Sequence, residues 1–295
     1  MKFKLFLIAS LLIYSCNSSD NESISLYNFL PSESKVIINI NDLDKTKEIL
    51  NMNNLLQSIF SSTKEISNQL NLLSTKKSDK GGILSLSSYG KDEIAYTYIR
   101  KSNSFDSIQE SDKLKNKYLN SEIFLEEING NEINKVIIDK YIVSSNKDII
   151  LENIIRDFYS NKSNLDSEFK KIIKTSDSDE PFNIYTKSDN LDTFENELSE
   201  ISFFPKSNTS WVAYDFNYSV ENIYLTGITR ISDSINGKIS ILKNIAASKT
   251  KTDKIIPNSF LTFLTISIND SERFIFNFKD YLKYNDLSTQ NLNFN

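Results

Sequence analysis

One local pattern recurs four times in this 295-residue chain and constrains its fold more than any other feature. Each copy has a short run of β-branched or aromatic residues, then an Asn/Asp/Ser cluster. The copies are Val36 to Ile40 before Asn41-Asp42, Tyr141 to Val143 before Asn146 to Asp148, Phe182 to Tyr185 before Ser188 to Asn190, and Leu261 to Ile268 before Asn269-Asp270. Side-chain oxygens in such clusters accept hydrogen bonds from the first-turn N–H groups of a helix. The pattern therefore predicts strands that lead directly into capped helices.

Apolar residues three or four apart follow three of these clusters, which is the spacing of one helix face. The three sets are Ile150, Ile154 and Phe158; Leu191, Phe194, Leu198 and Ile201; and Phe274, Phe278 and Leu282. Turn residues also separate paired strand signals. The turns are Gly90 to Asp92 between Ile83 to Ser87 and Ile94 to Ile99, Asn129-Gly130 between Ile123 to Leu125 and Val136 to Ile138, and Glu221-Asn222 between the runs that begin at Trp211 and Ile223. We expect an α+β fold with mostly antiparallel sheets and helices packed on one face.

A proline-led opening occurs twice. Leu30-Pro31 precedes the first strand-to-helix unit and Ile256-Pro257 precedes the last. We therefore expect two related α+β units, residues 28–175 and 176–295, with a repeat that begins at about residue 255 and is cut short. This opening resembles an uncharacterised family of bacterial envelope proteins whose repeats begin with Leu-Pro, a strand and a capped helix, and Tyr141 to Phe158 is similar to another element of that family. The resemblance implies a fold and no mechanism.

The first residues are typical of a secretory leader. A basic head, Met1 to Lys4, precedes an apolar run from Leu5 to Tyr14 that is interrupted only by Ser10. This run is about half the ~20 apolar residues that a membrane-spanning helix needs. Residues 1–15 are therefore predicted to be a signal peptide that is removed.

The end of this leader, Ile13-Tyr14-Ser15-Cys16, resembles the lipobox of bacterial lipoproteins, although Tyr14 replaces the small residue usual at its position. Cys16 is the only cysteine of the chain. The resemblance implies that its thiol receives a diacylglyceryl group and that the new amino terminus receives a further acyl chain, and several chains together hold a protein firmly to a bilayer. The alternative is an ordinary signal peptide with an incidental cysteine.

The residues after Cys16 favour a flexible link. Asn17 to Glu22 is polar throughout, so residues 16–27 are predicted to be a lipidated tether. Asn17 is not the aspartate that favours inner-membrane retention in lipoproteins of enteric type. We expect an outer-membrane address, on the periplasmic face or at the cell surface.

Composition excludes several functions. The net charge is −5 without a concentrated basic stretch, so a nucleic-acid partner is not expected. The chain has no histidine, and its one cysteine is assigned to lipid. Ser-His-Asp and Cys-His catalysis and zinc sites built on His or Cys are therefore excluded. No phosphate-binding loop motif occurs either, and we predict neither a metal site nor a cofactor.

Carboxylate chemistry stays open. The densest acidic groups are Asp42 with Asp44, and Asp177 with Asp179 and Glu180. A glycosidase needs two acids about 5–9 Å apart, but with 39 acidic residues many pairs meet that spacing by chance. The second group lacks the glycine and the closing Glu of a calcium loop. We favour a helix cap for the first group and a solvated loop for the second.

An aromatic stripe is the one candidate for ligand binding. Alternation places Val212, Tyr214, Phe216 and Tyr218 on one face of a strand, and Trp211, Ala213 and Asp215 on the other. Trp211, Tyr214 and Tyr218 could stack on sugar rings, although such a stripe is more often part of a core. We therefore expect a non-catalytic binding or structural lipoprotein of the cell envelope. The alternative is a glycan-binding or carboxylate-dependent glycan-processing lipoprotein, which an exposed Trp211 beside paired acids would favour.

Overall fold

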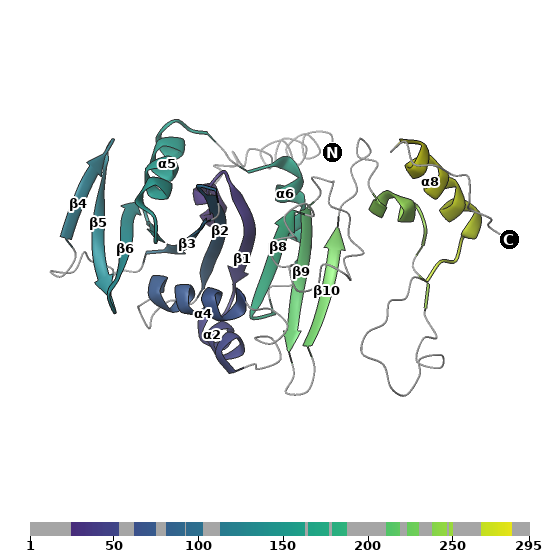
Figure 1. The fold of residues 1–295 in the computed structure, drawn as a ribbon, viewed down its shortest axis with the longest axis horizontal. Coiled ribbons are helices and arrows are strands. Elements are labelled where there is room, and N and C mark those ends of the chain that lie inside the picture. The colour runs from purple at the N-terminus through teal and green to yellow at the C-terminus, as the bar shows by residue number, and fades with distance from the viewer. Residues whose placement is uncertain are drawn as a thin grey trace, which may run out of the picture.

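The computed structural model describes residues 25–52, 62–74, 81–91, 93–102, 113–162, 165–176, 179–187, 211–218, 223–229, 238–246, 248–249 and 267–284. The strands of this part form a single antiparallel sheet in the order β10-β9-β8-β1-β2-β3-β7-β6-β5-β4 (Figure 1). They are β1 (Ser34–Ile40), β2 (Gly82–Tyr89), β3 (Glu93–Lys101), β4 (Lys113–Tyr118), β5 (Ser121–Ile128), β6 (Asn131–Ile138), β7 (Tyr141–Ser145), β8 (Phe182–Lys187), β9 (Trp211–Tyr218) and β10 (Ile223–Thr229). The predicted α+β class with antiparallel pairing is confirmed.

The described helices lie between and after these strands. They are η1 (Leu26–Phe29), α2 (Leu43–Met52), α4 (Ser62–Leu73), α5 (Asp148–Tyr159), α6 (Ser167–Ile172), η2 (Ile173–Thr175), η4 (Lys238–Leu242) and α8 (Ser271–Tyr284). Within the described residues, none of these helices has the length and apolar character needed to cross a membrane.

The prediction that the helices share one face of the sheet is wrong for the helices that cover β1. Val36, Ile38 and Ile40 pack in one apolar cluster with α2 and α4. Ile37 points to the other face, where it joins a second cluster with η1, α5 and α6. A strand that is apolar on both sides must be covered on both sides, as the uninterrupted run Val36-Ile37-Ile38 already indicates.

Strand β8 pairs with β1, so strands from both sides of the predicted boundary at residues 175 and 176 belong to one sheet. The two units, residues 28–175 and 176–295, stay a prediction. The repeat expected from about residue 255 lies largely outside the described residues, as does most of the strand predicted over Leu261 to Ile268. The third predicted polar cluster, at Ser188 to Asn190, and the helix predicted after it also lie outside them.

Two of the predicted helix caps are confirmed. The Asp42 Oδ1 atom accepts a hydrogen bond from the backbone N–H of Lys45 at 3.0 Å, and Asp270 Oδ1 accepts one from the N–H of Arg273 at 2.8 Å. Helix α5 begins differently: its N-cap residue Lys147 makes no side-chain cap, and Asp148 Oδ1, from the predicted cluster, accepts from the first-turn N–H of Ile149 at 2.9 Å. Upstream, the Oγ atom of Ser145 accepts from the N–H of Lys147 at 3.2 Å.

Strands β4 to β7 form a meander whose turns recur every ten residues. The first turn residues are Leu119, Asn129 and Asp139, with φ of 48°, 52° and 53°. Asn and Asp tolerate this left-handed backbone, whereas a residue such as Leu pays roughly 1–2 kcal/mol for it. The Asn129-Gly130 turn follows the hairpin prediction, and the leucine in the matching position of the first turn does not.

Neighbouring residues of β1 provide a test of the two-sided core. Ile37 and Ile38 are 1% and 5% exposed on opposite faces. We expect Ile37→Ala and Ile38→Ala each to lower the free energy of unfolding by about 2–5 kcal/mol. Urea unfolding of the Cys16→Ser form measures both values, with exposed Lys45→Ala as a control that changes stability little. A small loss for either isoleucine would contradict a core on that face.

Candidate functional site

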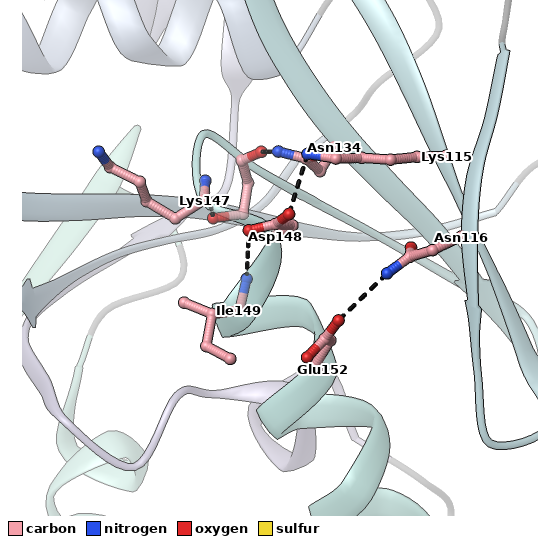
Figure 2. A network of polar contacts seen from close by, with 8 residues as sticks. Lys115, Asn116, Asn134, Lys147, Asp148, Ile149 and Glu152 are labelled. Carbon is pink, nitrogen blue, oxygen red and sulfur yellow. Dashed lines mark hydrogen bonds and ion pairs between the residues drawn. The ribbon is translucent and has the colours of Figure 1, made fainter.

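A polar network joins the edge strand β4 to the beginning of α5 (Figure 2). The register of β4 against β5 shifts between Leu114 and Asn116, so Lys115 lies at a bulge. Its Nζ atom lies 2.9 Å from Asp148 Oδ2 and donates to Asn134 Oδ1, also at 2.9 Å. The next residue, Asn116, donates from Nδ2 to Glu152 Oε1 on α5 at 3.1 Å.

The network continues into the sheet through buried side chains. Asn134 Nδ2 donates to the backbone carbonyl of Ser145 at 3.4 Å. The Ser145 hydroxyl donates to the carbonyl of Tyr96 at 2.9 Å and accepts from Thr97 Oγ1 at 3.3 Å. Asn134, Ser145 and Thr97 are all buried, so their hydrogen bonds offset the cost of removing polar groups from water.

Electrostatics couple the two charged members of this network. The hydrogen bond from Lys115, together with its positive charge, holds the pKa of Asp148 below its ordinary value, although burial acts in the opposite direction. Asp148 also lies in the first turn of α5, where a negative charge is favourable. A carboxylate whose pKa is lowered by a neighbouring positive charge is a poor proton acceptor. The arrangement therefore positions a helix on a sheet edge and offers no poised base.

A second polar cluster lies where β8 and β9 meet the segment after β1. Asn183, only 1% exposed, donates from Nδ2 to Asp215 Oδ1 at 2.8 Å. Its Oδ1 atom accepts from Asn41 Nδ2 at 3.0 Å, and Asn41 Nδ2 also reaches the carbonyl of Glu180 at 2.8 Å. The cluster fixes the Asn41 segment, which leads into α2, against the start of β8.

Trp211 is buried in the core rather than displayed on the surface. Its side chain is 5% exposed, and its ring centroid lies 4.5 Å from that of Phe169 on α6. The indole Nε1 donates to Asp166 Oδ2 at 3.2 Å, and Oδ1 of the same carboxylate caps α6 by accepting from the N–H of Glu168 at 2.7 Å. This burial favours the core interpretation of the stripe over stacking on sugars.

The faces predicted for β9 are those that the structure has. Trp211 and Ala213 belong to the cluster under α5 and α6, and Phe216 to the cluster under α2 and α4. Tyr214 is half-buried, and a Cβ atom added at Gly227 would lie 2.9 Å from its ring, so the ring packs over that glycine of β10. Tyr218 ends β9, and its side chain lies outside the described part. Ligand binding by Trp211, Tyr214 and Tyr218 therefore stays a prediction.

The two acidic groups named from the sequence meet through the backbone, because the N–H of Asp42 donates to the carbonyl of Pro181, next to Glu180, at 3.1 Å. Their described carboxylates nevertheless have separate structural partners. Asp42 caps α2, as favoured, and Glu180 Oε1 accepts from Asn217 Nδ2 at 2.9 Å. Asp177 and the lipidation candidate Cys16 lie outside the described residues. Among the residues that are described, no three His, Cys, Asp or Glu side chains lie together as a metal site would require.

The network around Lys115 was not predicted from the sequence. Strand β4 reads Lys-Leu-Lys-Asn-Lys-Tyr and lacks the β-branched residues by which the other strands were predicted. A bulge also has no reliable sequence signature. The one signal was Asp148, which belongs to the polar cluster predicted to cap α5. Its Oδ1 atom accepts from the first-turn N–H of Ile149 at 2.9 Å, as predicted, and its Oδ2 atom binds Lys115.

Comparison with protein-family models, with curated proteins and with solved structures finds no match for this chain.

The ion pair between Lys115 and Asp148 predicts a dependence of stability on pH. A carboxyl whose pKa is lowered by folding stabilises the protein above its unfolded pKa of about 4, and this contribution is lost as the pH falls through the folded value. Because Asp148 is 42% exposed, we expect Asp148→Asn to cost less than about 1 kcal/mol at pH 7. Urea unfolding at pH 7 and again below pH 4 should show this cost shrinking as the pH falls. The control, Asp44→Asn, also changes a first-turn aspartate, but in α2. An equal cost at both pH values would contradict the ion pair.

The buried Trp211 predicts an optical signal that glycans leave unchanged. As the only tryptophan it reports alone, and in an apolar environment we expect blue-shifted emission and weak quenching by acrylamide. Oligosaccharides from peptidoglycan or from the cell surface should leave this spectrum unchanged. A saturable change on their addition would favour the glycan-binding alternative.

Proposed function

We propose that the protein is a lipoprotein of the bacterial cell envelope, anchored to the outer membrane through acyl chains at Cys16. In this proposal the folded part is a non-catalytic binding or structural module. The single observation that carries the proposal is the sequence Ile13-Tyr14-Ser15-Cys16, which resembles a lipobox, follows a basic and apolar leader and contains the only cysteine of the chain. Its partner is then the lipid bilayer, with no nucleic acid and no cofactor.

The way in which the described polar residues are used supports the non-catalytic part of the proposal. Asp148 binds Lys115, Asp166 caps α6 and binds Trp211, and Asp215 binds the buried Asn183. Each of these carboxylates has a structural partner that reduces its availability for chemistry. We propose a role in which the body presents a surface or spaces other components, built from the two related units expected over residues 28–175 and 176–295.

The beginning of the fold suits a tether under load. Phe29 is fully buried, and its ring centroid lies 5.4 Å from that of Phe158 and 4.9 Å from that of Tyr141. A pull on residues 16–27 would therefore act directly on the core between η1 and α5. From Cys16 to Ser25 an extended chain spans roughly 30 Å, which is enough to hold the body beside the bilayer surface.

Lipidation is tested by changing the one cysteine. We expect the native protein to partition with membranes and to carry fatty acids in mass spectrometry of its amino-terminal peptide. Cys16→Ser should move it to the soluble fraction, because several acyl chains supply the binding. Cys16→Ser should leave the thermal unfolding midpoint unchanged, which separates loss of the anchor from loss of the fold. Membrane association of Cys16→Ser together with an unmodified native peptide would refute the proposal.

A further inference from the structure

An exposed leucine occupies a position that disfavours it for two reasons. Leu119 is the first residue of the β4–β5 turn, with a φ of 48°, where the matching turns of the same meander use Asn129 and Asp139. It is also 60% exposed. Asn or Asp would relieve the backbone and hydrate better at such a tip. Neither backbone conformation nor packing therefore explains the leucine.

A second exposed apolar side chain lies beside this turn. Tyr159, at the end of α5, is 42% exposed, and its phenol oxygen lies 3.3 Å from Ser121 Oγ. Ser121 begins β5, directly after the turn, so this hydrogen bond holds the hydroxyl of the tyrosine at the end of the turn that contains Leu119. We call Leu119 and Tyr159 the apolar tip. A tyrosine with an apolar ring and a polar end is typical of residues at a membrane interface.

The apolar tip lies near the place where the described chain begins. The ring of Tyr159 is in edge contact with Phe158 at 5.3 Å, and Phe158 stacks on Phe29 of η1 at 5.4 Å. The tip and η1 are thus joined through adjacent rings. Because an extended segment from Cys16 to Ser25 spans roughly 30 Å, a lipid at Cys16 and the apolar tip can meet the same bilayer.

We propose that the apolar tip inserts into the interfacial region of the bilayer that carries the lipid anchor, which fixes the orientation of the body on the membrane. This inference rests on the proposed lipidation of Cys16. The tether keeps the tip at high effective concentration near the surface, so two side chains suffice where they would not hold a free protein.

The charges around the apolar tip favour insertion over attraction to anionic lipid. Lys117 pairs with Glu122 at 2.5 Å, across the two strands that the turn connects. Lys140 follows Asp139 in the other turn at this end of the meander, so these charges also offset each other. We therefore expect the contact to form equally well on phosphatidylcholine alone.

A fluorescent label tests the depth of the tip. In the acylated protein a single new cysteine is the only free thiol, so Asn120→Cys can carry an environment-sensitive dye without changing Leu119. On phosphatidylcholine vesicles we expect blue-shifted emission and quenching by brominated acyl chains. The matched control is Glu132→Cys, an exposed position near the opposite end of the same meander, where we expect no quenching.

Leu119→Asn separates a membrane role from a structural one. In the Asn120→Cys background it should abolish the quenching and also raise the thermal unfolding midpoint by about 2–4 °C, because asparagine tolerates the left-handed backbone. A lowered midpoint would assign the leucine to packing and overturn the inference. Absence of quenching in acylated, vesicle-bound protein would overturn the inference and leave the proposed function standing. A protein without acyl chains would refute both.

Discussion

Strand β1 has to be covered on both faces, and the rest of the described fold follows from this requirement. It lies between β2 and β8 in the sheet, and its residues alternate between two apolar clusters. A single helical layer would leave either Ile37 or Ile38 in water, at a cost of about 1.5–3 kcal/mol for each side chain. The helices α2 and α4, which follow β1 in the sequence, cover one face. Helices α5 and α6 come from later segments and cover the other, so the middle of the sheet is closed only when distant parts of the chain have assembled.

Polar side chains then determine how the helices meet the sheet. A buried apolar cluster specifies contact but no direction, whereas a hydrogen bond between named groups fixes position. Asp148 on Lys115 sets the start of α5 at the bulge of β4, and Asp166 serves both the cap of α6 and the indole of Trp211. These groups look like site residues in the sequence because they are polar and close to helix starts. In the fold they connect layers, which supports the non-catalytic role that we propose.

Features with a local cause were predictable from the sequence, and features set by distant contacts were not. Three predicted features depend only on neighbouring residues, and the structure has all of them. They are the hairpin at Asn129-Gly130, the caps at Asp42 and Asp270, and the alternation of Trp211 with Val212. Strand β4 escaped prediction because pairing with β5, rather than its lysine-rich composition, makes it a strand. The error over the helical layers had a different origin. Amphipathic helices each have one apolar face, whereas uninterrupted runs such as Val36-Ile37-Ile38 indicate that the sheet has two.

The distinction between features with a local cause and features set by distant contacts also explains why Leu119 is informative. In a turn that local sequence normally determines, the residue departs from local preference while its counterparts Asn129 and Asp139 follow it. If packing within the fold offset the cost of the left-handed backbone, the leucine side chain would be buried, but Leu119 is exposed. The remaining physical source of compensation is a surface outside the folded chain that is less polar than water. In the lipoprotein that we propose, roughly 30 Å of chain would link the body to the lipid anchor, and the nearest such surface would be the bilayer itself.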